Sequence, residues 1–219
     1  MNIIDISQSI NNEMWSYRPE WKNIISAISS TSEGDASTVY KFELCSHTGT
    51  YIETSQHKLK NNVLLEHYSL HRFICNVKVL VIKNTSKEIK LEHILHELNV
   101  ADIGINVGDA LIICTGWGAR EYFSESFIVD APYFEEDLTN YLLQKKLSLL
   151  GVDTPVIDNQ IKPYFAVNKL FNSNEDLLLL APLAINPDEV KTGIYVLNAL
   201  PLKISGVSAS LCRPVLIEL

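Results

Sequence analysis

The chain has 219 residues, of which 47% are hydrophobic and 20% are charged, as is typical of a globular protein. Its 26 acidic and 18 basic residues give a formal net charge of −8, which disfavours nucleic acid and anionic membrane surfaces as partners. The N-terminus lacks the basic and apolar segments of a signal peptide, and the longest apolar run, at 177–185, is too short to span a membrane. Because the four cysteines are scattered and form no C-x-x-C pair, we expect a soluble cytoplasmic protein with reduced thiols.

Hydrophobic periodicity predicts a succession of strands and helices along the chain. In the first half, the expected elements are strands at 3–7, 39–44, 75–82 and 110–114, helices at 64–71 and 91–98, and a long polar loop at 11–35. In the second half, they are helices at 138–146 and 164–171, and strands at 147–152, 177–180, 194–199 and 215–219. No repeat or linker interrupts this succession, so we expect one α/β domain over residues 1–219.

The segment 45–57 is the richest in side chains that support chemistry. Because side chains alternate along an extended chain, we expect one face to carry His47, Tyr51, Glu53 and His57. Two imidazoles, a phenol and a carboxylate beside a glycine turn can bind a metal ion or transfer protons. An ordinary polar loop after a strand is the alternative interpretation, and spacing alone does not decide between the two.

The same segment resembles the signature His-x-Gly-Thr-His-x-Asp-x-x-x-His of the metal-dependent cyclase and kynurenine formamidase family. The residues in register with that signature are His47, Gly49, Thr50 and His57. Further segments resemble family elements in the same order along the chain: Asp5-Ile-Ser, Leu111 to Trp117 ending in Thr-Gly-Trp, Leu150 to Asp158, Ala199 to Lys203 with Pro-Leu-Lys, and Arg213-Pro-Val. The resemblance therefore covers nearly the whole chain.

The resemblance implies a swivelling β/β/α fold with a mixed sheet, assembled as a homodimer or a higher homo-oligomer. Family members hydrolyse amide or lactam bonds of small aromatic compounds, such as N-formylkynurenine, with metal-activated water. The partner that the resemblance implies for this chain is therefore a small-molecule ligand or substrate.

The signature itself departs from the family's metal site at two positions. Tyr51 and Glu53 stand where the family has a His ligand and an Asp ligand, whereas His57 is retained. A neutral phenol is a poor ligand near pH 7, since the ordinary pKa of tyrosine is about 10.

The later ligands of the family also lack counterparts. Val167 or Asn168 stands near the position of a His ligand, and Ala181 stands near that of a Glu ligand. All six histidines lie at or before His96, so none further along the chain replaces the missing one. Because a catalytic metal usually has three protein ligands, we expect no metal cofactor. If an ion binds, its ligands are expected to be Glu53 and His57.

Two hypotheses follow. In the first, the chain keeps the fold and the pocket without the usual metal, and either binds a small aromatic or amide-containing molecule as a pseudoenzyme or acts as a metal-independent enzyme. His57 and Glu53 would then transfer protons while Tyr51 donates a hydrogen bond to a developing oxyanion. The residues expected to bind the substrate are His47, Trp117 and Trp15.

In the second hypothesis, the chain is a metal-dependent amide hydrolase with a rearranged ligand shell. That shell would consist of Tyr51, Glu53 and His57 with substrate or water, and it would hold zinc or manganese.

The remaining histidines are expected to have no metal role. His67 with His71, and His93 with His96, share a helix face in each case. Without a third ligand nearby, such pairs usually face solvent.

Two other groups have structural interpretations. Asp153 and Asp158 flank a turn, where hydrogen bonds to the local backbone account for them. Trp15, Tyr17 and Trp21 fall in the long polar loop, where they can form a hydrophobic lid or a dimer contact.

Overall fold

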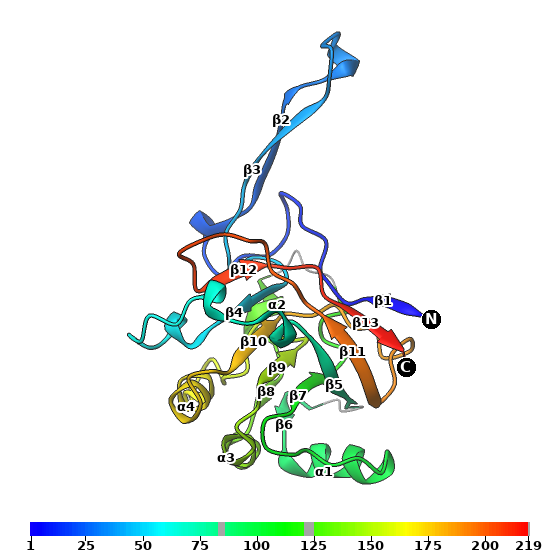
Figure 1. Ribbon diagram of the computed structural model, residues 1–219, viewed down its shortest axis with the longest axis vertical. Helices are drawn as coiled ribbons and strands as arrows, with labels where there is room; N and C mark the ends of the chain where they lie inside the picture. The colour runs from blue at the N-terminus through cyan, green and yellow to red at the C-terminus, as the bar shows by residue number, and fades with distance from the viewer. Residues whose placement is uncertain (83–85, 121–124, 219) are drawn as a thin grey trace.

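Residues 1–82, 86–120 and 125–218 are described by a computed structural model, in which nine strands form one mixed sheet (Figure 1). In order across the sheet, the strands are β1 (Ile3–Asp5), β13 (Val215–Glu218), β11 (Gly193–Asn198), β5 (Ile74–Val81), β7 (Ala110–Cys114), β9 (Leu149–Val152), β10 (Leu178–Ala181), β4 (Tyr51–Glu53) and β12 (Ala209–Leu211). The central strands β5, β7, β9 and β10 run parallel, and antiparallel strands flank them on both sides. The expected α/β class with a mixed sheet is confirmed.

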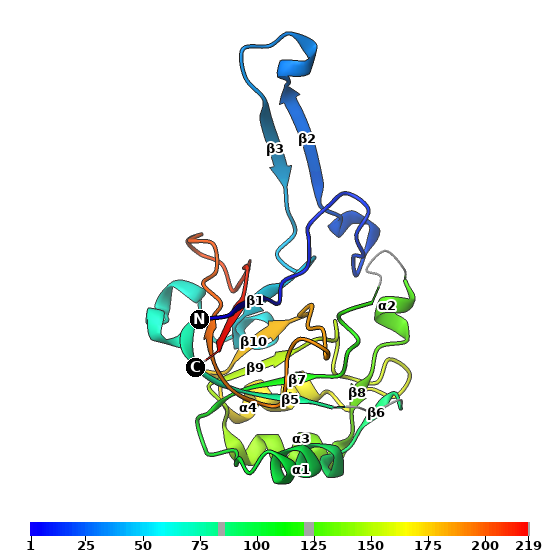
Figure 2. The same ribbon diagram turned by 90° about the vertical axis from the view of Figure 1, so that its right-hand side faces the viewer.

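Helices cover one face of this sheet (Figure 2): α1 (Leu91–Val100), α3 (Glu136–Lys145) and α4 (Ala166–Ser173). Strand β7 shows how the chain builds a core on each face. Its residues Leu111 and Ile113 pack against the helices, whereas Ile112 packs on the other face with Ile6 and Leu183. Because both faces are buried, the strand is apolar throughout rather than alternating.

The smaller elements lie around this framework. They are the short helix α2 (Ser126–Val129), the parallel pair β6 (Glu88–Ile89) and β8 (Tyr133–Phe134), and the 3-10 turns η1 (Pro19–Trp21), η2 (Thr31–Glu33), η3 (Ser55–His57), η4 (Leu65–His67) and η5 (Leu70–Arg72). In the part of the chain that the structure describes, no helix is long and apolar enough to cross a membrane.

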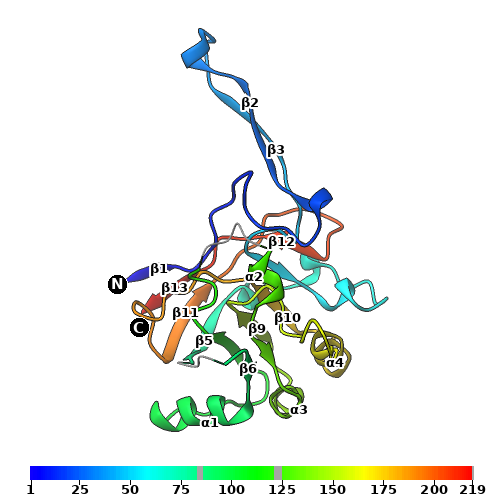
Figure 3. The ribbon, with the colours of Figure 1, turned by 180° about the vertical axis from the view of Figure 1, so that it is seen from behind.

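A hairpin of β2 (Ile24–Ser29) and β3 (Val39–Glu43) projects from the body of the molecule (Figures 1 and 3), and we call residues 24–43 the arm. The prediction of a long polar loop at 11–35 is therefore wrong for residues 24–35, which belong to the arm. The arm has no core to bury, and its residues Ile28, Tyr40 and Phe42 are 55–66% exposed. Without a buried face, β2 lacks the alternation by which a strand is recognised in a sequence.

The helix expected at 64–71 is also wrong. The segment forms two separate 3-10 turns, η4 and η5, joined by extended backbone at Tyr68 and Ser69. Leu65 is buried, and its N–H donates to the carbonyl of Val207. The extended backbone at Tyr68 and Ser69 ends the first turn before a further helical bond can form.

Candidate functional site

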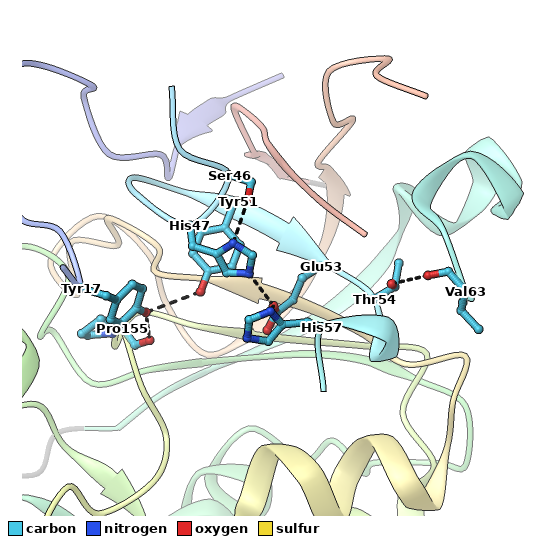
Figure 4. Close-up of polar contacts among 9 residues, drawn as sticks. All are labelled: Tyr17, Ser46, His47, Tyr51, Glu53, Thr54, His57, Val63 and Pro155. Atoms are coloured by element: carbon cyan, nitrogen blue, oxygen red, sulfur yellow. Dashed lines mark hydrogen bonds and ion pairs between the residues drawn. The ribbon is translucent and has the colours of Figure 1, made fainter. Parts of the chain in front are cut away.

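A cavity of about 410 Å³ opens beside β4, where several loops converge. Its chemically active side chains come from the loop before β4, from β4 itself and from the turn η3 (Figure 4). The wall opposite is largely apolar and is formed by Val152, Pro155, Val156, Ile157, Phe165, Val167, Leu179 and Ala181. A cavity of this size, apolar with a few polar groups, is typical of a site for a small molecule.

Local backbone geometry aims the polar side chains into this cavity. Gly49 has a φ of 98°, which residues with a Cβ rarely adopt, so the turn that leads into β4 favours glycine. Along β4, Ile52 is buried in the sheet core, and the alternation of a strand sends Tyr51 and Glu53 to the opposite face. The turn η3 then brings His57 back toward Glu53.

Two imidazoles meet the Glu53 carboxylate in this cavity (Figure 4). The Nε2 atom of His47 lies 3.0 Å from Glu53 Oε2, and the Nδ1 atom of His57 lies 3.6 Å from the same oxygen. The other ring nitrogen of His47 is 2.8 Å from the Ser46 hydroxyl, which fixes the ring orientation. The predicted convergence of residues from 47 to 57 is thus present, although only Tyr51–Glu53 is a strand.

Burial controls the protonation of His57. It lowers the pKa of this imidazole, and the Glu53 charge, which would raise the pKa, does not reverse the shift; His47 and Lys58 lower it further. His57 is therefore neutral near pH 7, which is the form that binds a metal ion or accepts a proton.

Tyr51 points to a second phenol instead of to the carboxylate. Its hydroxyl lies 3.4 Å from the Tyr17 hydroxyl, and Tyr17 in turn donates a hydrogen bond to the carbonyl of Pro155. Burial raises the pKa of both phenols, so both carry their proton at neutral pH. Tyr17 was assigned by sequence to a lid or dimer contact; its place in the cavity depends on contacts with residues distant in the sequence.

The donor set fits one metal ion. The candidate ligand atoms of His47, Glu53 and His57 all lie within 4.8 Å of one another. Around a tetrahedral zinc ion with bonds of about 2.1 Å, ligand atoms are roughly 3.4 Å apart, close to the 3.0 and 3.6 Å found here. Two imidazoles and a carboxylate are also a known ligand set of catalytic zinc. The structure thus adds His47 to the two ligands that the sequence suggested, and the expected loss of the metal site is not confirmed.

Of the residues that the structure describes, Asp158 is the only carboxylate besides Glu53 that lines this cavity, and no second group of three potential ligands forms there. Among the described residues of the opposite wall, Val167 and Ala181 stand where the resemblance places further ligands, and Asn168 offers only a neutral amide.

The two tryptophans expected to bind substrate lie behind the cavity wall. Trp15 and Trp117 pack around Phe127 in a buried cluster, and neither is among the residues that line the cavity. Trp15 packs edge-on against Tyr17, with ring centroids 5.0 Å apart, and the Trp117 indole donates to the Phe127 carbonyl. A direct contact of either with substrate stays a prediction, whereas the Tyr, Trp and Phe residues that line the cavity are Tyr17, Trp21, Tyr51 and Phe165.

Asp153 is explained by long-range rather than local hydrogen bonds. Its carboxylate accepts from the backbone N–H and from the hydroxyl of Thr115, both at 2.9 Å. These bonds tie the end of β7 to the end of β9. The turn explanation is therefore wrong for Asp153, because its partners are 38 residues away. Asp158, by contrast, accepts from the backbone N–H of Ala166 at the start of α4.

Two of the remaining histidines cap local turns. The Nδ1 atom of His67 accepts from the Leu64 N–H, and that of His93 accepts from the Lys90 N–H. His71 and His96 are exposed. No metal cluster forms around these four in the described ranges.

Residues 4–159 match the family model described as "Putative cyclase", which is well over half of the chain. The chain therefore belongs to the cyclase family. It is similar to the kynurenine formamidase of Bacillus thuringiensis subsp. konkukian (strain 97-27), with 26% identity over 222 residues that cover 97% of this chain and 96% of the relative.

Solved structures share the fold. Isatin hydrolase A from Ralstonia solanacearum has a TM-score of 0.80 at 18% identity, covering 99% of this chain and 92% of its own. A predicted metal-dependent hydrolase from Bacillus stearothermophilus has a TM-score of 0.77 at 22% identity, and the match covers 98% of this chain and 97% of that protein. At such identities the likeness shows the fold alone.

Proposed function

We propose that this protein hydrolyses an amide or lactam bond in a small aromatic molecule, using a single zinc or manganese ion held by His47, Glu53 and His57. The observation that carries the proposal is the convergence of these three side chains in one cavity. The proposal extends to this chain the class of chemistry in the names kynurenine formamidase and isatin hydrolase.

Different residues of the chain supply the charge that holds the ion and the surface that binds the substrate. Glu53, only 3% exposed, supplies negative charge that favours a cation between the two imidazoles. The apolar wall of Phe165, Val167 and Leu179 accepts an aromatic ring and excludes water. When bound, the ion would supply Lewis acidity that polarises a carbonyl and activates water.

The test measures hydrolysis of N-formylkynurenine and isatin by dialysed protein, with zinc, manganese or a chelator, beside the metal content. We expect activity that follows one equivalent of metal. Glu53→Gln keeps the size of the side chain and removes its charge, so it should lower the rate about a hundredfold or more. Glu43→Gln, on the exposed arm, is the matched control. Full activity in chelator would contradict the metal-dependent proposal.

A metal-independent enzyme is the second candidate. It is favoured by the 3.0 Å contact of His47 with Glu53, which satisfies the carboxylate without an ion. Apart from Glu53, Asp158 is the only carboxylate among the described residues that line the cavity, and it accepts a hydrogen bond from the backbone N–H of Ala166. In a metal-independent enzyme, His57 would be the general base. The rate of hydrolysis would persist in chelator and would fall about a hundredfold in His57→Ala. A pseudoenzyme would bind these compounds and turn over neither.

We also infer that a second copy of the chain covers the arm. A two-stranded ribbon that exposes Ile28, Tyr40 and Phe42 is marginally stable alone. A twofold contact buries the same apolar surface from both copies at once. The base of the arm is tied to the site, since Asn23 hydrogen-bonds the backbone of Cys45 and Thr48, on either side of His47.

A further inference from the structure

The Tyr51 and Tyr17 phenols form a hydrogen-bonded chain with a fixed direction (Figure 4). The chain ends on the carbonyl oxygen of Pro155, to which Tyr17 donates. A carbonyl oxygen only accepts, and a phenol has a single proton, so the proton of Tyr17 is committed to Pro155. In the 3.4 Å contact between the two hydroxyls, Tyr17 must then accept and Tyr51 must donate. The proton of Tyr51 consequently points toward Tyr17, and its oxygen offers only lone pairs to a bound molecule.

We propose that Tyr51 accepts a hydrogen bond from the N–H of the substrate's amide or lactam group, and that Tyr17 is the positioning residue that gives Tyr51 this polarity. The pair would thus select compounds with a free N–H over their N-alkylated analogues. This inference rests on the proposed function. It replaces the sequence-based expectation that Tyr51 donates to an oxyanion.

Packing holds both phenols in this arrangement. Tyr51 is 4% exposed, and its ring lies 4.7 Å from the His47 ring. The Trp15 ring packs nearly perpendicular to the Tyr17 ring. The reverse direction, with Tyr17 donating to Tyr51, would leave the close contact of Tyr17 with the Pro155 carbonyl without a proton, so two lone pairs would face each other.

The other polar groups around the cavity leave this role open. Lys58 and Arg18 are cations that only donate, and Glu53 already faces two imidazoles. Asp158 accepts from the backbone N–H of Ala166.

Of the remaining polar residues of the lining, Gln160 and Asn168 are amides that can both donate and accept, so they do not by themselves select for a free N–H. An N–H group buried without an acceptor weakens binding, because its hydrogen bond to water is lost and not replaced. Tyr51 supplies an acceptor within the cavity.

The test uses three ligands: isatin, N-methylisatin and 5-methylisatin. Both methyl derivatives add the same group, but only N-methylisatin loses the N–H. Affinities are measured by calorimetry on the full chain in chelator, where metal-dependent turnover does not interfere. We expect the native protein to bind isatin and 5-methylisatin alike and N-methylisatin about tenfold or more weakly.

The variants assign this preference to the two phenols. In Tyr17→Phe, the Tyr51 proton is free to turn toward the ligand, so the preference should fall below about threefold. Tyr51→Phe removes the acceptor and should do the same. Tyr141→Phe, on α3 and outside the cavity lining, should keep the native preference. Circular dichroism establishes that each variant is folded. If Tyr17→Phe does not fold, Tyr51→Phe alone tests whether the phenols cause the preference for a free N–H.

Native protein that binds N-methylisatin as well as 5-methylisatin would overturn the inference, as would full preference in Tyr17→Phe. Failure to bind any of the three ligands in chelator would also overturn it, whereas the proposed function, which requires the metal, is tested separately by the hydrolysis assay. Binding of all three without preference likewise leaves the proposed function standing.

Discussion

The His47 Nε2 atom lies 3.0 Å from the Oε2 atom of Glu53, and the two side chains are only 14% and 3% exposed. A buried carboxylate that faces imidazole nitrogens favours any cation that can join it, whether a proton or a metal ion. His57, at 3.6 Å from the same oxygen, completes a set that a cation can occupy.

Metal binding should therefore depend on His47. We expect His47→Ala to weaken zinc binding more than about a hundredfold, since loss of a direct ligand exceeds the 10- to 100-fold effect of an outer partner. His96→Ala, on the exposed side of α1, should leave the affinity unchanged. Zinc titration with a competing chelator measures both. Equal affinity in the two variants would exclude His47 as a ligand.

The bond from Thr115 to Asp153 should stabilise the fold in a pH-dependent way. Burial raises the pKa of Asp153 although the hydrogen bonds from Thr115 lower it, so the ionised form costs stability above the folded pKa. That cost disappears as the pH falls below the unfolded value of about 3.9, where the group is protonated in both states.

Thr115→Val removes a donor to the ionised carboxylate, and we expect it to lower the free energy of unfolding by about 1–3 kcal/mol at pH 7. The loss should shrink as the pH falls, because a protonated carboxyl needs that donor less. Urea unfolding at several pH values measures this trend. Thr38→Val, on the exposed arm, is the control, and a loss that grows toward low pH would contradict the assignment.

Gly118 should tolerate no side chain. A Cβ atom there would lie 1.8 Å from the carbonyl oxygen of Leu183, which is backbone and cannot turn aside. We expect Gly118→Ala to cost about 3 kcal/mol or more. Gly104, where nothing lies within 4 Å, is the matched control, and its change to Ala should alter stability by less than about 1 kcal/mol. Thermal and urea unfolding measure the stability of both variants.

The arm should govern the oligomeric state. We expect the native chain to have the mass of a dimer or a higher oligomer by light scattering, and Phe42→Lys to shift it to the monomer because a charge cannot be buried in an apolar contact. Val107→Lys changes a residue that is 70% exposed in a turn outside the arm, and it should leave the mass unchanged. A monomeric native chain, or an unchanged mass in Phe42→Lys, would show that the arm makes no such contact.

The sequence predicted those features that local patterns encode. The apolar run Ala110–Cys114 predicted a buried strand, since a strand covered on both faces needs no polar positions. The segment from His47 to His57 predicted a shared site through its resemblance to the family signature, since its spacing alone was equally compatible with a polar loop. The structure brings His47, Glu53 and His57 together.

Only the tertiary structure decided which groups oppose that signature. The pairing of Tyr51 with Ala181 sets an apolar wall across from the ligands, and no local pattern specifies that pairing. Tyr17 reaches both Tyr51 and Pro155, a residue 138 positions away, and so determines the direction of the Tyr51 hydroxyl. Local sequence sets which chemical groups are available, whereas contacts between distant segments set how their protons and charges are arranged.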